Sequence, residues 1–312
     1  MAGTVLVTGG AGFIGSHVVD LLLGEGRGVV VLDDLSMGSA DNVAAEATLQ
    51  QIDIADGSAV DRVADSVRPS FVYHLAAQAS VTRSVAEPGF DCSVNVVGTL
   101  NLLEAAKRHE APLVFASTGG ALYGAEAPIP TPEDFPPAPI SPYGASKLAG
   151  EAYVLTWSRS DSIPHSVLRL GNVYGPRQRP HGEAGVVAIF SGYLWRGESP
   201  TVFGFGRPTR DYVHVHDVVR AMRLAEGAGG TFNVATGRET DVSEVLEGLE
   251  RAAGSSVEPA LAPLRDGELE RSCLDPQRAE ELLGWRAEIE VETGLRQTYE
   301  ALVQEFERDP AG

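Results

Sequence analysis

The sequence predicts an α/β protein in which a doubly wound parallel sheet carries helices on both faces and a smaller C-terminal α/β lobe follows. Short, unbroken runs of β-branched apolar residues at 4–10 and 28–34 are typical of strands buried on both faces. The segment between them, IGSHVVDLLLGEG, has helical periodicity and ends in glycines, as helices often do. The alternation of strand and helix continues to about residue 175, which favours a parallel sheet.

The remaining elements of the sheet follow in chain order. Further strands are expected at residues 50–56, 70–77, 112–118 and 165–175, with helices at 93–109 and 143–157. The second of these helices begins after a serine and a proline, which are favoured at a helix N-terminus. These elements predict a first domain that spans residues 1–174.

The residue pattern of the chain changes after Gly175. The segment PRQRPHGEAG is loop-like, and later apolar runs are shorter, so residues 175–312 are expected to form the second lobe. A helix and a strand within 211–236 are expected to return to the first domain. Residues 275–285 predict a further helix, with an Asp N-cap, a Pro in the first turn and a Gly stop.

Composition and charge limit the classes of function. The chain has 312 residues, of which 43% are hydrophobic, so it can bury a large core. A formal net charge of −19 argues against nucleic acid and anionic membranes as partners, and no apolar run approaches a membrane span. Two cysteines make no disulfide framework and no basic leader precedes the first strand, so a cytoplasmic protein is expected. No metal site is expected, and the side chains of His214 and His216 in VHVHD are expected to point to opposite faces.

A glycine-rich loop joins the first strand to the first helix. Gly9, Gly12 and Gly15 stand in the spacing G-x-x-G-x-x-G, with Phe13 and Ile14 at the start of the helix. Glycines let the turn close and let the backbone approach a pyrophosphate, which then lies on the helix N-terminal amides. This is the Rossmann-type arrangement for a dinucleotide.

Several strand ends complete the expected dinucleotide site. Asp33 closes the second strand, where its carboxylate can accept the adenosine ribose hydroxyls, and an acid there favours NAD over NADP. Asp53 and Ile54 are expected to end the third strand, and Leu75, Ala76 and Ala77 the fourth, at the edge that a dinucleotide crosses. Asp53 has two interpretations, since it can hydrogen-bond adenine or cap the next turn.

Tyr143 and Lys147 stand four residues apart, so they share one face of the predicted helix. A free phenol has a pKa of about 10 and is a poor base at neutral pH. An ammonium about 5 Å away, at an effective dielectric constant of about 20, favours the phenolate by roughly 3 kcal/mol, or about two pKa units. The pair therefore predicts a base whose pKa Lys147 lowers toward the working pH. The alternative is a surface tyrosine packed on a lysine stem.

The chain resembles the extended short-chain dehydrogenases/reductases and, within them, the UDP-glucose (UDP-galactose) 4-epimerase family. The resemblance covers nearly the whole length and rests on seven blocks in the family's order: TGGAGFIGSH, HLAAQASV, NVVGTLNLLEA, ASTGGALYG, SPYGASKLAGE, RLGNVYGPRQRPHGEAG and RDYVHVHDV. It implies a tightly bound, recycled NAD, a UDP-sugar substrate and a homodimer formed through a helix bundle. The helices at 93–109 and 143–157 are the candidates for that bundle.

The resemblance also assigns roles to residues. Tyr143 is the base, Lys147 also binds the nicotinamide ribose, Asn95 belongs to the cofactor site, and Thr118 is the hydroxyl that shuttles the proton, with Ser117 as the alternative. The loop from Thr118 to Tyr123 is one residue longer than in many members, which leaves that alternative open. Asn172, Arg210 and Arg265 match residues that bind the substrate diphosphate, and Ser272 matches the residue that limits room around the sugar's C2 substituent.

The expected reaction is inversion at C4 of a UDP-hexose through a 4-keto intermediate. Related 4,6-dehydratases carry Asp-Glu after the threonine, whereas this chain carries Gly119 and Gly120, which cannot transfer protons. The small Ser272 predicts turnover of UDP-GlcNAc/UDP-GalNAc beside UDP-glucose/UDP-galactose. The alternatives are a UDP-glucuronate or UDP-xylose 4-epimerase or a decarboxylase. Arg177, Arg179 and His181 of the loop after Gly175 would bind a uronate carboxylate or simply line a solvated loop. A different class is a non-catalytic dinucleotide-binding protein.

Overall fold

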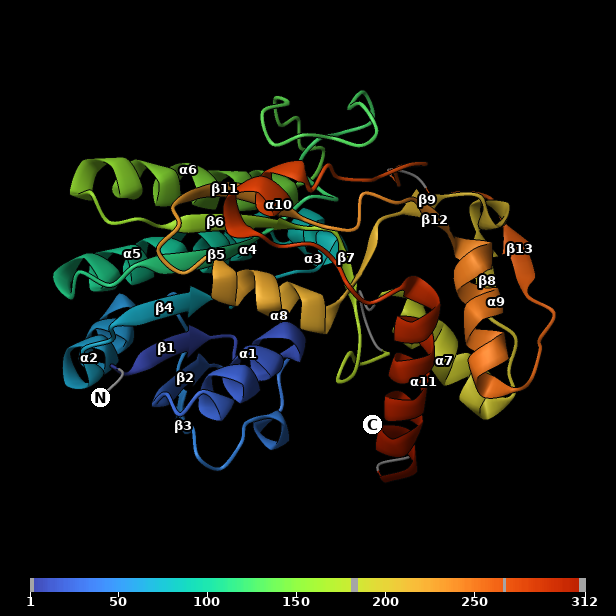
Figure 1. Ribbon diagram of the computed structural model, residues 1–312, viewed down its shortest axis with the longest axis horizontal. Coiled ribbons are helices and arrows are strands. Elements are labelled where there is room, and N and C mark those ends of the chain that lie inside the picture. The colour runs from blue at the N-terminus through green and yellow to red at the C-terminus, as the bar shows by residue number, and fades with distance from the viewer. Residues whose placement is uncertain (1–2, 181–184, 266–267, 309–312) are drawn as a thin grey trace.

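The computed structural model describes residues 3–180, 185–265 and 268–308. Its centre is a parallel sheet of seven strands in the order β11-β6-β5-β4-β1-β2-β3 (Figure 1). The strands are β1 Val5–Thr8, β2 Val29–Asp33, β3 Thr48–Gln51, β4 Phe71–His74, β5 Leu113–Thr118, β6 Ser166–Leu170 and β11 Gly230–Val234. The strand order reverses direction between β1 and β4, and ligands of such sheets bind in the crevice at this point, outside the carboxyl ends of the strands.

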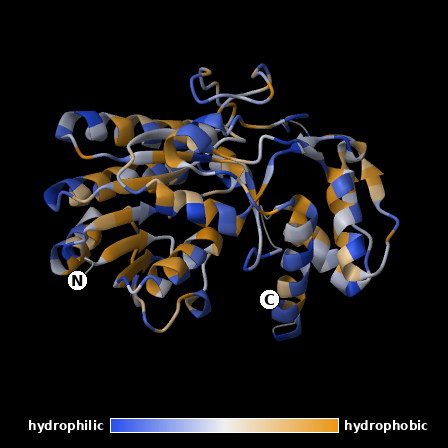
Figure 2. Ribbon diagram, in the orientation of Figure 1, coloured by the Kyte–Doolittle hydropathy of each residue, from blue (hydrophilic) through white to orange (hydrophobic). Residues whose placement is uncertain are grey.

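Helices cover both faces of the sheet because the strands are apolar on both faces. Val5 and Val7 of β1 belong to one hydrophobic cluster, whereas Leu6 between them belongs to another. The helices α1 Phe13–Gly24 and α8 Val215–Leu224 pack on the first face, and α2 Gly57–Val67, α5 Gly98–Arg108 and α6 Pro142–Asp161 cover the second. Figure 2 shows the resulting apolar strands between amphipathic helices. The expected doubly wound sheet is confirmed.

A smaller lobe lies beside this sheet (Figure 1). It contains the helices α7 Val186–Arg196, α9 Val242–Ala253 and α11 Val291–Arg308, and the short strands β8 Thr201–Phe203, β9 Thr209–Arg210, β12 Thr240–Asp241 and β13 Ala260–Ala262. Its core is a separate cluster that includes Phe190, Leu194, Leu249 and Leu295. The helix α10 Gln277–Leu283 packs back on β11, and Gly284 ends it with a positive φ, as expected. Asp275 accepts a hydrogen bond from the Gln277 amide, although the cap position itself is Pro276.

Two expected strands have different bounds. The third strand ends at Gln51 rather than at residue 56, because Asp53 starts a turn in which its carbonyl and its carboxylate accept the amides of Asp56 and Ala55. The segment 165–175 divides at Gly171 into β6 and a second strand, β7 Asn172–Tyr174. β7 pairs with β10 Tyr212–His214 outside the main sheet.

The expected helix at 93–109 is also subdivided. It begins as a π-helical turn at Ser93–Val97 and continues as α5. Two short helices that the sequence did not predict, α3 Val81–Ala86 and α4 Pro88–Cys92, precede it. α3 and α4 both pack against α6. No helix of the described residues is long and apolar enough to cross a membrane.

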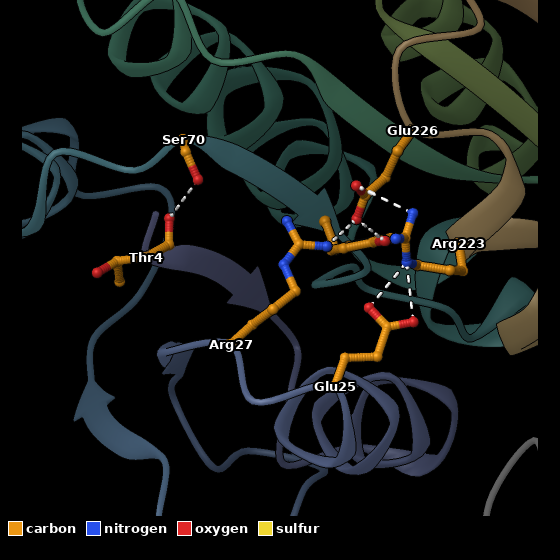
Figure 3. A network of polar contacts seen from close by, with 7 residues as sticks. Thr4, Glu25, Arg27, Ser70, Arg223 and Glu226 are labelled. Carbon is orange, nitrogen blue, oxygen red and sulfur yellow. Dashed lines mark hydrogen bonds and ion pairs between the residues drawn. The ribbon is translucent and has the colours of Figure 1, made fainter. Parts of the chain in front are cut away.

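A polar network closes the amino ends of the strands (Figure 3). The carboxylate of Glu226 accepts hydrogen bonds from the Tyr73 hydroxyl and from Arg27, and it lies 3.3 Å from Arg223. Arg223 in turn binds Glu25 after α1. These contacts join β4, α1 and α8 at one end of the sheet, and the opposite, carboxyl end holds the candidate site.

Candidate active site

The glycine loop follows β1 directly and leads into α1. Gly9 has a φ of +70°, and a Cβ built on it would lie 2.6 Å from the Ala76 amide nitrogen. A Cβ on Gly15 would clash with the carbonyl oxygen of Gly9. Gly12 is the N-cap of α1 and offers no side-chain acceptor, so the helix N-terminal amides at Phe13, Ile14 and Gly15 remain available to an anion. This loop fits a pyrophosphate bound through the backbone.

Asp33 lies beside this loop, at the end of β2. Its Oδ2 accepts the Ala11 amide at 3.0 Å and its Oδ1 accepts the Leu35 amide at 2.9 Å. Each carboxylate oxygen has a second lone pair. Asp33 is buried, and burial raises the pKa of its carboxyl above the ordinary value. The position and the remaining acceptor capacity fit the ribose hydroxyls of NAD.

The strand-end residues lie at different depths along the same edge. Leu75, Ala76 and Ala77 follow β4 next to Gly9, and the Thr8 hydroxyl accepts the Ala76 amide at 3.2 Å. Ile54 is buried against Gly98 in the core. Asp53 is exposed, and its Oδ1 accepts the Ala55 amide at 2.8 Å. Of the two interpretations of Asp53, the turn is the contact that the structure contains.

Asn95 lies deeper than a residue that contacts a cofactor needs to be. Its side chain is buried and binds both the amide and the carbonyl of Gln78, at 2.9 Å each. Its Nδ2 also donates to the Ser146 hydroxyl at 3.0 Å and to Asp91 at 3.1 Å. Asn95 therefore ties the segment after β4 to α6, which supports a positioning role in the cofactor site.

The helix α6 begins one residue before Tyr143. The Ser141 hydroxyl caps it by accepting the Gly144 amide at 3.2 Å, and Pro142 occupies the first turn. The side chain of Tyr143 meets that of Thr118, the last residue of β5. Lys147 is only 3% exposed, and its Nζ lies 4.2 Å from the centre of the Phe115 ring. The fold thus brings Tyr143, Lys147 and Thr118 together at the carboxyl edge of the sheet.

Burial dominates the pKa values of this pair. It raises the pKa of Tyr143 to about 12, against the hydrogen bond from Thr118, which lowers it. Burial also lowers the pKa of Lys147 to about 8. In the protein chain by itself the pKa of Tyr143 is therefore shifted in the direction opposite to the expected one, because loss of water around the phenolate is the largest influence and the Asp91 carboxylate acts in the same direction. A positive charge beside the phenol, such as a nicotinamide ring, would favour the phenolate.

The two neighbouring hydroxyls at the end of β5 point to different partners. Ser117 donates to Oε1 of Glu151 at 2.5 Å, whereas Thr118 meets Tyr143. Side chains alternate along a strand, so only one of them faces the base. The geometry supports Thr118 as the shuttle.

We expect Thr118→Val to lower kcat by about 100-fold, because a positioned hydroxyl in the proton path is lost while the side-chain volume is kept. Ser117→Ala is the matched control and should mainly lower stability, by about 1 kcal/mol, since it removes a hydrogen bond to a buried carboxylate. Steady-state kinetics and thermal melting measure both. A larger kcat loss in Ser117→Ala than in Thr118→Val would reverse the assignment.

A small pocket follows Thr118, and Ser272 is the expected substrate residue that lines it. Gly119, Gly120 and Ser272 line it together, and Oδ1 of Asn172 lies 3.8 Å from a Cβ built on Gly120. A side chain on Gly119 would clash with Leu274, so this position has no room for a catalytic acid.

The two expected arginines lie in different settings. Arg210 ends β9, is half-buried and donates to the Thr209 carbonyl at 2.8 Å; that carbonyl also accepts the Ser272 amide at 3.2 Å. Arg210 and Ser272 are therefore neighbours across Thr209. Arg265 is 60% exposed, stacks on the Phe203 ring at 3.9 Å and lies 3.6 Å from Glu268. It belongs to the rim of the smaller lobe.

The geometry of His214 and His216 differs from the expected one. Their ring centroids lie 4.9 Å apart, where β10 ends at His214 and α8 begins at Val215. The expectation of opposite faces is wrong, because side chains two residues apart on a strand share a face. His216 also contacts the ring of His17. Among the described residues, no group of three or more His, Cys, Asp or Glu side chains could hold a metal ion.

Sequence reasoning missed a charged pair behind the base. Glu151 and Arg169 are both buried, and the Arg169 guanidinium binds the Glu151 carboxylate through Nε and Nη2. Glu151 lies four residues after Lys147, on the same helix face. The spacing Y-x-x-x-K-x-x-x-E could have indicated it.

A glycine loop at the switch point, an acid that ends β2 and a Tyr-Lys helix against a strand-end threonine define a dinucleotide-binding short-chain dehydrogenase/reductase. Residues 5–235 match the NAD dependent epimerase/dehydratase family, and the chain belongs to this family. This confirms the family expected from the sequence, whose description includes NAD as the cofactor.

The chain is similar to characterised epimerases over nearly its whole length. It is 47% identical to a UDP-glucose 4-epimerase of Mycolicibacterium smegmatis, over 95% of this chain and 97% of that protein. It is 46% identical to the crystal structure of UDP-glucose 4-epimerase with UDP-glucose from Thermotoga maritima, with a TM-score of 0.95 over 97% of this chain and 99% of that one. A UDP-glucose 4-epimerase of Thermus thermophilus in complex with NAD is 45% identical, with a TM-score of 0.89 over 96% of this chain and 98% of that one.

Proposed function

We propose that this protein is a UDP-hexose 4-epimerase that keeps NAD bound and inverts C4 of UDP-glucose and UDP-galactose. The observation that carries the proposal is that the side chains of Tyr143 and Thr118 meet at the end of β5, with Lys147 buried one turn further along α6. The base and the hydroxyl lie at the carboxyl edge of the sheet that also holds the glycine loop. An epimerase needs these groups and a cofactor that is regenerated in each catalytic cycle.

In the proposed mechanism the protein holds groups and moves protons. The bound NAD supplies a hydride acceptor and donor for C4. The glycine loop amides and Asp33 hold the dinucleotide, and Lys147 is placed to bind its nicotinamide ribose. Tyr143 accepts the proton of the sugar's 4-hydroxyl and later returns it, while Thr118 binds the same oxygen. If the 4-keto sugar turns over between the two steps, C4 is inverted without net oxidation.

The substrate diphosphate needs local cations, because the chain has a formal net charge of −19. Arg210 and Asn172 line the approach to Thr118, and Arg265 supplies a charge at the rim. In this proposal the domain of residues 1–174, with 211–236, binds the dinucleotide, and the lobe of residues 175–312 binds the sugar nucleotide. The small Ser272 leaves room for a larger C2 substituent, so UDP-GlcNAc is a further expected substrate.

No contact of the described residues favours the uronate alternative. Arg177, in the loop after Gly175, is already paired with Asp20 at 2.6 Å. His181 lies outside the described residues. A decarboxylase or a uronate epimerase therefore remains the second choice.

Incubation of the purified protein with UDP-glucose, UDP-GlcNAc or UDP-glucuronate, without added NAD, tests the proposal. We expect UDP-galactose from UDP-glucose, and NAD in the denatured protein after gel filtration. Product formation from UDP-GlcNAc tests the expectation for Ser272 separately. Absence of any turnover, or a stoichiometric requirement for added NAD, would contradict an epimerase.

We also propose a homodimer through a helical face. The helices expected to form it were those at 93–109 and 143–157, and the structure adds α3 and α4 beside α6. Large apolar side chains on this face are exposed, namely Val85 at 64%, Val81 at 40% and Phe90 and Tyr153 at 38% each. Exposed apolar clusters of this kind are typical of association surfaces. Light scattering should give twice the chain mass, and Val85→Glu should shift it toward the monomer. A monomeric wild-type protein at micromolar concentration would contradict the dimer.

The chemistry of the thiols supports the proposal of a cytoplasmic location. Cys92 is exposed and Cys273 is buried, and both are free. A reducing compartment keeps such thiols unpaired. Cell fractionation tests this location.

A further inference from the structure

A buried cluster of charges lies directly behind the proposed base. Lys147 is 3% exposed, Glu151 is 1% exposed and Arg169 is 6% exposed. Lys147 and Glu151 are one helical turn apart on α6, and Arg169 comes from β6. Fully buried charges are rare unless each is paired, because they lose their hydration. The cluster therefore requires an explanation beyond packing.

Glu151 connects three elements that position the base. Its carboxylate accepts from Arg169 Nη2 at 2.7 Å and from Nε at 3.0 and 3.1 Å. It also accepts the Ser117 hydroxyl at 2.5 Å. Ser117 immediately precedes Thr118, so one carboxylate holds α6, β6 and the end of β5 together. The position of Thr118 against Tyr143 depends on this connection.

Arg169 has further partners that fix it on the far side of Glu151. Its Nη1 donates to the Tyr123 hydroxyl at 2.5 Å and to the Glu133 carbonyl at 2.9 Å. These contacts direct the guanidinium away from α6 and toward the segment after β5. The carboxylate of Glu151 is therefore the member of the pair that belongs to the helix of Lys147.

The groups that face Lys147 come from four elements. Phe115 of β5 lies under its ammonium, and His74 of β4 is buried, with a pKa lowered well below its ordinary value by burial and by Lys147. His74 is therefore neutral. Tyr143 is the phenol on the same helix, and the two carboxylates that raise the pKa of Lys147 are Glu151, the stronger influence, and Asp91 of α4.

The charges of the cluster balance only while Glu151 is ionised. Lys147 and Arg169 carry two positive charges, and Glu151 and Asp91 carry two negative charges. Without the Glu151 carboxylate, Asp91 is the one acid left in this group of four beside Lys147 and Arg169, and burial then favours the loss of a proton from one of the two cations. Lys147 is the cation that loses its proton, because a guanidinium keeps its proton far more strongly than an amine does.

We propose that Glu151 is a positioning residue of the base, whose carboxylate keeps Lys147 protonated and anchors α6 to the end of β5. This role rests on the proposed function, because only a charged Lys147 favours the phenolate of Tyr143. A neutral Lys147 amine would fill the same space but would not stabilise the Tyr143 phenolate electrostatically. The residue thus acts through Lys147 and does not touch the substrate.

The chain offers a direct measurement, because it has two lysines, Lys107 and Lys147. Lys107 is half exposed and pairs with Asp161 at 3.1 Å, so it serves as an internal reference. NMR of the protein with 13C-labelled lysine gives two side-chain signals, and Lys107→Arg assigns them. In the wild-type protein we expect Lys147 to titrate at about 8.

The critical variant is Glu151→Gln, which keeps the shape and the Ser117 contact but removes the charge. We expect the pKa of Lys147 to fall by about one unit, in line with the loss of an opposite charge within one helical turn. In the active enzyme kcat should fall, and the alkaline limb of the pH profile should move to lower pH. Glu151→Asp keeps the charge and should keep the pKa of Lys147 close to that of the wild type.

A double variant, Glu151→Gln with Arg169→Gln, tests the proposal if the single variant does not fold, because it leaves no lone buried guanidinium. It still removes the carboxylate that raises the pKa of Lys147 most, so this pKa should fall, by less than in the single variant. An unchanged pKa of Lys147 in the single variant, or in the double variant if the single one does not fold, overturns the proposal. A lower kcat with an unchanged pKa would show a purely structural role and also overturns it. A wild-type protein that shows the lysine shift but no turnover would instead contradict the proposed function.

Discussion

Tyr143→Phe is expected to lower kcat for UDP-glucose by about 10²- to 10⁴-fold, the usual contribution of a positioned general base. The substitution removes only the hydroxyl that binds Thr118. The ring remains half-buried at the start of α6, so the fold and the bound NAD should be retained. Steady-state kinetics, with the NAD content of the same sample, measure the effect.

Tyr153→Phe is the matched control for this variant. Tyr153 lies in the same helix, and its side chain is 38% exposed on the outer face. Loss of its hydroxyl should leave kcat within about twofold of the wild type, since exposed substitutions usually change little. If Tyr143→Phe retains more than about a tenth of the wild-type kcat, the phenol is not the general base.

Gly15→Ala is the second large effect that we expect. A Cβ at this position clashes with the carbonyl oxygen of Gly9, which is backbone and cannot turn aside. The loop must then open, which removes the close approach that the pyrophosphate requires. We expect the purified variant to lose its NAD on gel filtration and to be destabilised by about 1–3 kcal/mol, as overpacking generally costs. Absorbance of the released nucleotide and thermal melting provide the measurements.

Gly24→Ala tests whether the effect comes from the clash rather than from the change of residue type. Gly24 ends the same helix, and no heavy atom of the described chain lies within 4 Å of a Cβ built there, beyond its own neighbours. This variant should keep NAD and gain up to about 1 kcal/mol, because alanine favours helix over glycine. Equal NAD loss in both variants would exclude the glycine loop as the binding site of the pyrophosphate.

The sequence alone was sufficient where a pattern is local. The runs at 4–10 and 28–34 predicted buried parallel strands because period and composition depend on neighbouring residues only. Gly9, Gly12 and Gly15 predicted the cofactor loop because the tight turn itself demands glycine. Tyr143 and Lys147 were found in the same way, since helical geometry fixes which side chains lie together at a spacing of four. For each of these the structure contains the expected placement.

One expectation failed on local geometry, because side chains two residues apart on a strand share a face, and the rings of His214 and His216 lie 4.9 Å apart. Other expectations depended on segments that are distant in the chain. Asn95 stays a prediction for the cofactor site, and the partners of its amide nitrogen are Gln78, Asp91 and Ser146. No local pattern contains the packing partners that decided these cases.

The sequence by itself determined the parallel sheet, the glycine loop and the Tyr-Lys helix, because each is a property of consecutive residues. Tertiary structure decided that Thr118 rather than Ser117 meets Tyr143, and that Glu151 and Arg169 lie behind Lys147. It also decided the direction in which the pKa of Tyr143 moves. Burial and the partners of a buried charge arise only when separate strands and helices close around a side chain, so they cannot be read from spacing.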